Sequence, residues 1–206
     1  MIEIREVSSK EKSIIKQVVK IHLDTFQGFF LTFMGKGFLT CLYKSYCQYK
    51  ESGLLVAFED NNPVGFLAYS GDYSGIYKFM LKTKLIPFAW YSLGAFLRNP
   101  KVFIRLIRAL SKSDEVKRKE KYIELASIGV SPNSKTKGIG TALINELKRM
   151  VDFDIYSYIS LETDAENNKT ANCFYRKNGF ALERTYQTKE GRIMNEYRYS
   201  EKNIIS

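Results

Sequence analysis

The sequence has little of several residue types that mark particular classes of protein. A single histidine, His22, offers no histidine cluster for a metal and no Ser-His-Asp arrangement. Three cysteines, an odd number without Cys-x-x-Cys spacing, indicate buried reduced thiols and not a disulfide framework. No apolar run approaches the ~18 residues of a membrane-spanning helix, and the acidic N-terminus does not resemble a signal peptide. These absences predict a cytoplasmic protein without a metal centre.

The chain does contain enough apolar material for a full core. Its 206 residues, 45% hydrophobic and 26% charged, are typical of one soluble globular domain, which we expect to span residues 1–206. The net charge of +10 is unevenly distributed, because residues 72–121 contain twelve Lys or Arg and four Asp or Glu. This one segment therefore carries most of the positive charge.

The most informative stretch joins a strand, a turn with glycines and a helix. Residues 123–130 form a β-branched, apolar run that predicts a buried strand, and residues 141–150 have apolar side chains at helical spacing. Between them lies Lys135-Thr136-Lys137-Gly138-Ile139-Gly140. The first turn of a helix has unpaired N–H groups and a partial positive charge, and glycine lets a phosphate approach the backbone. This pattern is typical of a site for a phosphate-bearing cofactor.

Two common phosphate motifs do not fit these residues. A Walker loop needs a lysine after its last glycine, whereas Lys137 precedes Gly138. A dinucleotide fingerprint needs Gly or Ala where Leu143 stands. From spacing alone, a tight turn without a ligand is an equally good interpretation.

Two segments taken together are more specific. The first is Lys135-x-x-Gly138-x-Gly140, and the second is Asn168-x-x-Ala171-Asn172-x-Phe174-Tyr175-x-x-x-Gly179-Phe180. They resemble, in order, the Gln/Arg-x-x-Gly-x-Gly/Ala signature and the second CoA-contacting segment of the GNAT N-acetyltransferase superfamily. The departure is Lys135, which keeps the positive charge of arginine but loses its planar fork. The resemblance covers residues 50–71 and 120–200, and hardly extends to residues 72–119.

The resemblance implies that acetyl-CoA is the co-substrate and that its phosphates lie on the glycine turn. Backbone N–H groups near the end of the strand are expected to stabilise the oxyanion, and two asparagines to hydrogen-bond either the pantetheine arm or the cofactor near the start of the second helix. The cofactor-binding residues that we predict are Ile128, Gly129, Val130, Lys135, Thr136, Lys137, Gly138, Gly140, Thr141, Asn168, Asn172 and Tyr175.

Three residues are candidates for catalysis. In the superfamily, a carboxylate on the fourth or fifth strand commonly deprotonates the amine, and Glu124 and Glu162 stand at the corresponding places. A surface ion pair is the alternative role for each glutamate. Tyr175 aligns with the tyrosine that protonates the leaving thiolate, and its alternative role is packing beside Phe174.

The predicted elements are consistent with an α/β GNAT-like fold, which has a central mixed, mostly antiparallel sheet flanked by helices. Residues 28–35 are expected to form an aromatic loop, and residues 73–120 a helical insertion of two or three amphipathic helices with basic outer faces. The helices that we predict are 10–26, 36–49, 141–150 and 170–178, and the strands are 2–6, 54–59, 63–70, 122–130, 158–163, 180–187 and 193–200.

The acceptor is less well defined. The aromatic loop and the basic insertion predict a roomy, positive acceptor side, which favours an amine on an anionic small molecule such as a nucleotide-linked amino sugar. Acetylation of protein N-termini or lysines is an alternative, as is a non-catalytic protein that binds acyl-CoA or docks at a membrane. The insertion also allows peripheral membrane contact through residues 84–112, whereas no nucleic acid partner is expected. A homodimer through the last strand, residues 193–200, is left open.

Overall fold

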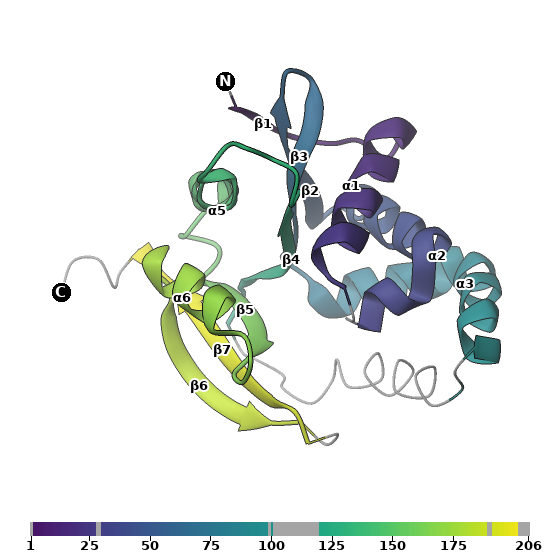
Figure 1. Cartoon of the computed structure of the whole chain (residues 1–206). Coiled ribbons are helices and arrows are strands. Elements are labelled where there is room, and N and C mark those ends of the chain that lie inside the picture. The colour runs from purple at the N-terminus through teal and green to yellow at the C-terminus, as the bar shows by residue number, and fades with distance from the viewer. Residues whose placement is uncertain (1, 28–29, 99, 101–119, 189–190, 202–206) are drawn as a thin grey trace.

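The computed structural model describes residues 2–27, 30–98, 100, 120–188 and 191–201. Its described strands form one seven-stranded sheet in the order β1-β2-β3-β4-β5-β7-β6. Helices cover both faces of the sheet (Figure 1). The strands are β1 (Ile2–Glu6), β2 (Ser52–Glu59), β3 (Asn62–Ser70), β4 (Ile123–Val130), β5 (Ile159–Asp164), β6 (Ala181–Gln187) and β7 (Ile193–Tyr199).

Every neighbouring pair of strands is antiparallel except β4 and β5, which are parallel. The β2–β3 hairpin turns at Asp60 and Asn61, which both have positive φ. Two such residues in sequence make the turn whose twist matches that of a hairpin. The predicted mixed, mostly antiparallel sheet is confirmed.

Three helices cover one face of the sheet: α1 (Lys12–Thr25), α2 (Phe30–Tyr46) and α3 (Tyr73–Arg98). The prediction of an aromatic loop over residues 28–35 was wrong for the part that the structure describes, because α2 begins at Phe30. Gly35, with φ 85° and ψ 175°, is not helical and divides α2 into two helical halves that meet at a kink. Met34 and Phe38, on either side of the interruption, are buried, so packing keeps both halves of the helix in place.

The predicted insertion begins with one long helix. α3 continues through Pro87, which lacks an N–H and normally kinks a helix. The next residue, Phe88, packs against Phe38 of α2 with ring centroids 4.8 Å apart. The remainder of the predicted insertion, residues 101–119, lies outside the described residues.

The opposite face is covered by α5 (Ile139–Met150) and α6 (Lys169–Lys177). Leu143, Ile144 and Leu147 of α5 are buried against β2, β3, β4 and β5, as their helical spacing predicts, whereas Met150 is exposed. Strand β2 is buried on both sides because it lies between the two helical layers. Within the described residues, no helix combines the length and the apolarity needed to cross a membrane.

Candidate active site

The sheet opens between β4 and β5. The two strands, both fully described, pair at only two positions: Ile123 with Ile159, and Glu124 with Ser160. Beyond these residues the strands separate, and β5, β7 and β6 turn away from the first half of the sheet (Figure 1). Because alternate N–H groups of a strand point to each side, this part of β4 has donors that face β5 without being paired to it.

A bulge in β4 lies at the start of this opening. Leu125 and Ser127 pair with consecutive residues of β3, which leaves Ala126 without a partner there. An extra residue of this kind bends the strand that carries it. The bulge therefore directs the second half of β4, which contains the predicted oxyanion donors, away from the line of β5.

The end of β4 is tightly packed. A Cβ atom at Gly129 would lie 2.8 Å from the ring of Phe66 and 3.2 Å from that of Phe26, so only glycine fits. The hydroxyl of Thr25 donates to the carbonyl of Val130 over 3.0 Å, which ties the end of α1 to this strand. Ile128 packs on the other face, in the core beneath α5.

The glycine turn at the start of α5 presents unpaired donors. Gly138 has φ 82°, in the left-handed region, and a Cβ atom there would have no neighbour within 4 Å. Glycine is thus needed for the backbone conformation and not for packing. The first helical hydrogen bond runs from Ala142 N–H to the carbonyl of Gly138. The earlier N–H groups, of residues 139–141, have no acceptor among the described residues, so they can bind an anion.

The two lysines of the turn strengthen this anion site. Lys135 and Lys137 are exposed, and neither forms an ion pair with a described residue. Thr136, between them, points elsewhere, since its hydroxyl hydrogen-bonds the carboxylate of Glu59 at the β2–β3 hairpin. The side chain of Thr136 therefore anchors the turn, and the lysines supply the attraction.

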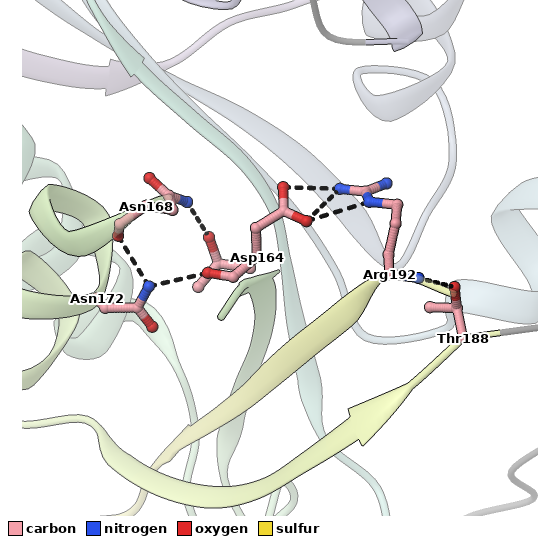
Figure 2. A network of polar contacts seen from close by, with 6 residues as sticks. Asp164, Asn168, Asn172, Thr188 and Arg192 are labelled. Carbon is pink, nitrogen blue, oxygen red and sulfur yellow. Dashed lines mark hydrogen bonds and ion pairs between the residues drawn. The ribbon is translucent and has the colours of Figure 1, made fainter. Parts of the chain in front are cut away.

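Asn172 holds α6 against β5 and β7. Its Nδ2 atom donates to the carbonyls of Asp164 and Asn168 over 2.9 and 2.8 Å (Figure 2). Its Oδ1 atom accepts from Asn195 Nδ2 and Tyr197 Oη over 2.7 and 2.9 Å. These four bonds use every donor and acceptor position of the amide. Asn172 thus positions the helix, where we had expected it to hydrogen-bond the cofactor itself.

Asn168 precedes α6, and fewer of its side-chain hydrogen-bonding positions are occupied than in Asn172. Its Nδ2 atom donates to Thr163 Oγ1 over 2.7 Å (Figure 2). Its Oδ1 atom has no partner among the described residues and keeps two lone pairs to offer. A hydrogen bond to the pantetheine arm stays a prediction for this residue.

Tyr175 lies in α6 with its ring inside an aromatic group. The ring centroids of Phe174, Phe180 and Tyr197 are 5.4, 6.1 and 6.0 Å from its own. Burial raises the pKa of the Tyr175 hydroxyl to about 12. The hydroxyl makes no hydrogen bond to a described residue, and at neutral pH it is protonated. It can therefore donate a proton but cannot accept one from an ammonium group.

Residues 15–180 match the sequence model of the Acetyltransferase (GNAT) family, which is well over half of the chain. The chain belongs to the GNAT acetyltransferase family. The predicted enzyme class, an acyltransferase with acetyl-CoA as co-substrate, is thereby confirmed. A search of curated proteins finds no match to the chain.

Solved structures show the same fold over nearly the whole chain. A Bacillus anthracis protein described as a streptothricin acetyltransferase, in complex with acetyl coenzyme A, has a TM-score of 0.58 at 14% identity and covers 97% of this chain and 98% of its own. Arabidopsis thaliana NAA60, in complex with acetyl-CoA, has a TM-score of 0.56 at 14% identity, with 98% and 99% covered. The ribosomal-protein-S18-alanine N-acetyltransferase of Escherichia coli has a TM-score of 0.57 at 12% identity, with 97% and 94% covered.

The two candidate bases of this GNAT acetyltransferase lie on the same face of the sheet, opposite α5 and α6. Glu124 is at the closed end of the opening, beside a buried group of hydroxyls from Tyr46, Tyr73 and Tyr77. Burial raises the pKa of all three hydroxyls, and the charge of Glu124 adds to the rise. These groups make Glu124 part of a packed polar cluster.

Glu162 lies two residues beyond the last paired position of β5, where the strands have separated. It is exposed, and the hydroxyl of Tyr186 donates to its Oε2 atom over 2.6 Å. Asp164, on the same face, forms a bidentate ion pair with Arg192, drawn in Figure 2. Of the two glutamates, Glu162 therefore lies nearer to the open part of the sheet.

Sequence reasoning did not single out the residues that support this face. Tyr186 and Arg192 come from the β6–β7 hairpin, and their relation to Glu162 and Asp164 depends on strand register, which no local motif encodes. A buried chain of polar contacts was also missed. The hydroxyl of Tyr43 lies 2.6 Å from His22 Nδ1 and 3.5 Å from Ser127 Oγ next to the bulge. His22 thus has the structural environment typical of a lone core histidine.

Proposed function

We propose that this GNAT enzyme transfers the acetyl group of acetyl-CoA to a primary amine within the opening between β4 and β5. The observation that carries the proposal is the arrangement on the two sides of that opening. The unpaired N–H groups of α5 and the exposed lysines lie on one side, and the carboxylates of β5 face the other. An anionic donor and a cationic amine would each meet the opposite charge.

The donor side binds acetyl-CoA through its phosphates. The N–H groups at the start of α5 receive the pyrophosphate, and Lys135 and Lys137 add charge that is worth roughly 0.3–1 kcal/mol each at an exposed helix N-terminus. The unpaired backbone donors at residues 128–130 of β4 stabilise the oxyanion. The thioester carbonyl would then lie beside residues 128–130, just beyond the bulge at Ala126.

The acceptor amine must lose a proton before it attacks. Deprotonating an ammonium with a pKa near 10.4 costs roughly 4–5 kcal/mol at pH 7, so a base is needed. Glu162 takes this proton, directly or through water, and Glu124 is the second candidate. The amine nitrogen then bonds to the thioester carbon, the carbon–sulfur bond breaks, and Tyr175 gives its proton to the leaving thiolate.

We infer the class of acceptor from the charges of α2 and α3, which cover the face of the sheet on which Glu162 lies. α2 and α3 contain no Asp or Glu, whereas they contain five lysines and one arginine. Such a layer attracts anions over a distance of about a Debye length. This supports the amine of an anionic small molecule, such as a nucleotide-linked amino sugar.

A second candidate, the N-terminal amine of a protein, has its own support. One of the similar structures is a ribosomal-protein-S18-alanine N-acetyltransferase, although at 12% identity it shares only the fold. The carboxylate of Glu162 is suited to a peptide ammonium. The positive layer of α2 and α3 disfavours basic peptides, so an acidic peptide would be the better test substrate.

The experiment is a coupled measurement of CoA release with a panel of amines, alongside Tyr175→Phe. We expect turnover with nucleotide-linked amino sugars, none with their N-acetylated forms, and a fall in kcat of at least about tenfold for Tyr175→Phe with unchanged acetyl-CoA affinity. Tyr199→Phe is the matched control, because Tyr199 packs in the same core and lacks a proposed role. If only peptide amines were acetylated, the acceptor would be a protein and not an anionic small molecule. An unchanged rate for Tyr175→Phe would show that Tyr175 is not the acid that protonates the thiolate.

A further inference from the structure

The exposed side of α3 is apolar. Ile86, Trp90, Leu93 and Leu97 follow one another at intervals of three or four residues, which places them on one helical face. Ile86, Trp90 and Leu97 are 82%, 73% and 74% exposed. Leu85, next to Ile86, and Leu81, about one turn before Leu85, are also exposed and lie to one side of this row. We call these six residues the α3 stripe. Soluble proteins seldom leave a continuous apolar row of this length in water, so the stripe indicates a contact surface.

The other side of the same helix already has partners. Ile76 and Met80 are buried in the core, and Phe88 packs on Phe38 of α2. A Cβ atom at Gly37 of α2 would collide with the ring of Tyr91, so the two helices are in close contact there. The α3 stripe is therefore not needed to hold the helix on the domain.

The charged residues of α2 and α3 are all basic. Lys78 and Lys82 are exposed and lie on the same side of the helix as the stripe, one or two turns toward its N-terminus. Lys84 lies close enough to Cys41 and Lys44 of α2 for its charge to act on the Cys41 thiol. Neither α2 nor α3 contains an acidic residue that could neutralise these groups.

We propose that the α3 stripe docks on the surface of an anionic lipid bilayer. An exposed helix face with leucine, isoleucine and tryptophan beside lysines is the composition of an interfacial helix, which buries its apolar side among acyl chains while its cations meet lipid phosphates. A second copy of the chain would bring an equally cationic face against this one and would be repelled. Residues 101–119, with seven Lys or Arg and two Asp or Glu, have charge of the same sign.

The chain contains its own reporter for this contact. Trp90 is the only tryptophan, and it lies in the middle of the α3 stripe. Its fluorescence in the full-length protein without lipid should have the long-wavelength maximum of an indole in water. Vesicles of phosphatidylcholine with phosphatidylglycerol should shift the emission to shorter wavelength, and brominated acyl chains should quench it. Vesicles of phosphatidylcholine alone should do neither.

Two sets of variants test the two parts of the surface. The double variant Ile86→Asp, Leu97→Asp keeps Trp90. It should weaken binding to the anionic vesicles by at least about tenfold, because two apolar side chains that would be buried in the bilayer are lost. Ile155→Asp is the matched control, since Ile155 is an exposed apolar residue in the loop after α5 and should bind as the wild type does. Lys78→Glu with Lys82→Glu should weaken binding by about tenfold or more and reduce its salt dependence.

Three other results of these measurements would contradict the proposal. Emission that is already at short wavelength without lipid would mean that the chain itself covers the α3 stripe, or a second copy if the maximum depends on protein concentration. Equal binding to neutral vesicles would show that anionic lipid is not required. An equal emission shift with a short RNA duplex would show that the surface binds nucleic acid and not specifically lipid. The assay contains no acetyl-CoA or amine, so its outcome is independent of the proposed acetyl transfer.

Discussion

Replacing Gly138 with alanine separates the conformation of the glycine turn from its role in binding. The new methyl group would meet no atom within 4 Å, so packing is unaffected. The backbone, at φ 82°, disfavours any residue with a Cβ atom by roughly 1–2 kcal/mol. For a chain of this size that strain lowers Tm by about 2–8 °C.

The effect on acetyl-CoA should exceed this loss of stability. In the proposed binding mode, a phosphate approaches the unpaired N–H groups through the space beside Gly138, which the methyl group would occupy. Losing one charge-assisted hydrogen bond of this kind costs about 1.5–3 kcal/mol, which is a rise in Kd of about 10–100-fold. Calorimetric titration with acetyl-CoA measures Kd, and thermal unfolding without ligand measures Tm.

Gly191→Ala is the matched control. Gly191 has φ 86° in the β6–β7 turn, and the nearest atom to its Cβ would be Gln187 Nε2 at 3.9 Å. The backbone strain is therefore the same, but Gly191 lies in the hairpin of β6 and β7 and not at the glycine turn before α5. We expect a similar fall in Tm with unchanged Kd. If Gly138→Ala lowered Tm as predicted and left Kd at the wild-type value, the phosphates would not bind at this turn.

Three further predictions concern the carboxylate, the buried amide and the histidine. Glu162→Gln should lower kcat by about 100-fold with unchanged acetyl-CoA affinity, and a wild-type rate would exclude Glu162 as the base. Asn172→Ala leaves Asn195 Nδ2 and the hydroxyl of Tyr197 without the acceptor that they share and should reduce the free energy of unfolding by roughly 2–4 kcal/mol, measured with urea; a loss below 1 kcal/mol would contradict this. Burial lowers the pKa of His22 to about 4, so the unfolded chain binds a proton between pH 6.5 and 4 that the folded chain excludes. The wild type should therefore lose roughly 3 kcal/mol as pH falls through this window, and His22→Phe should lose clearly less in urea unfolding at pH 7 and near pH 4; equal losses would assign the dependence to other groups.

Local signals predicted the half of the fold that contains the proposed cofactor site. The strand at Ile123–Val130, the glycine turn and the helix that follows were placed within a few residues, because β-branched runs, helical periodicity and glycines act over short distances. The GNAT family was predicted from two motifs in this same region. The departure of Met150 from the buried face shows how periodicity fails at a helix end, where no partner covers the last turn.

The helical layer on the other face was harder to predict. Pro87 is a local helix breaker and yet lies inside α3, whereas Gly35 does break α2, but the residues before it, from Phe30, are helical where a loop was predicted. Contacts between distant residues, such as Phe38 with Phe88, hold these helices in place, and no short window of sequence contains them. Secondary structure then follows tertiary packing and not propensity.

The direction of side chains was the other limit. The motif placed Asn172 at the right point of α6, but its four partners come from three separate elements. The hydrogen bond between Tyr186 and Glu162 likewise depends on the register of β5, β7 and β6. Spacing within one motif contains no information about either network.

The short pairing between β4 and β5 also bears on aggregation. Strands that carry unpaired N–H and C=O groups can recruit strands from other molecules, and proteins usually protect such edges with charge, proline or a covering element. Here the two unpaired edges face each other inside one sheet, between strands that are paired along most of their far sides. A strand from another molecule would have to enter between β4 and β5 of the same domain. The fold can thus keep open backbone groups for a thioester without offering them to a neighbouring chain.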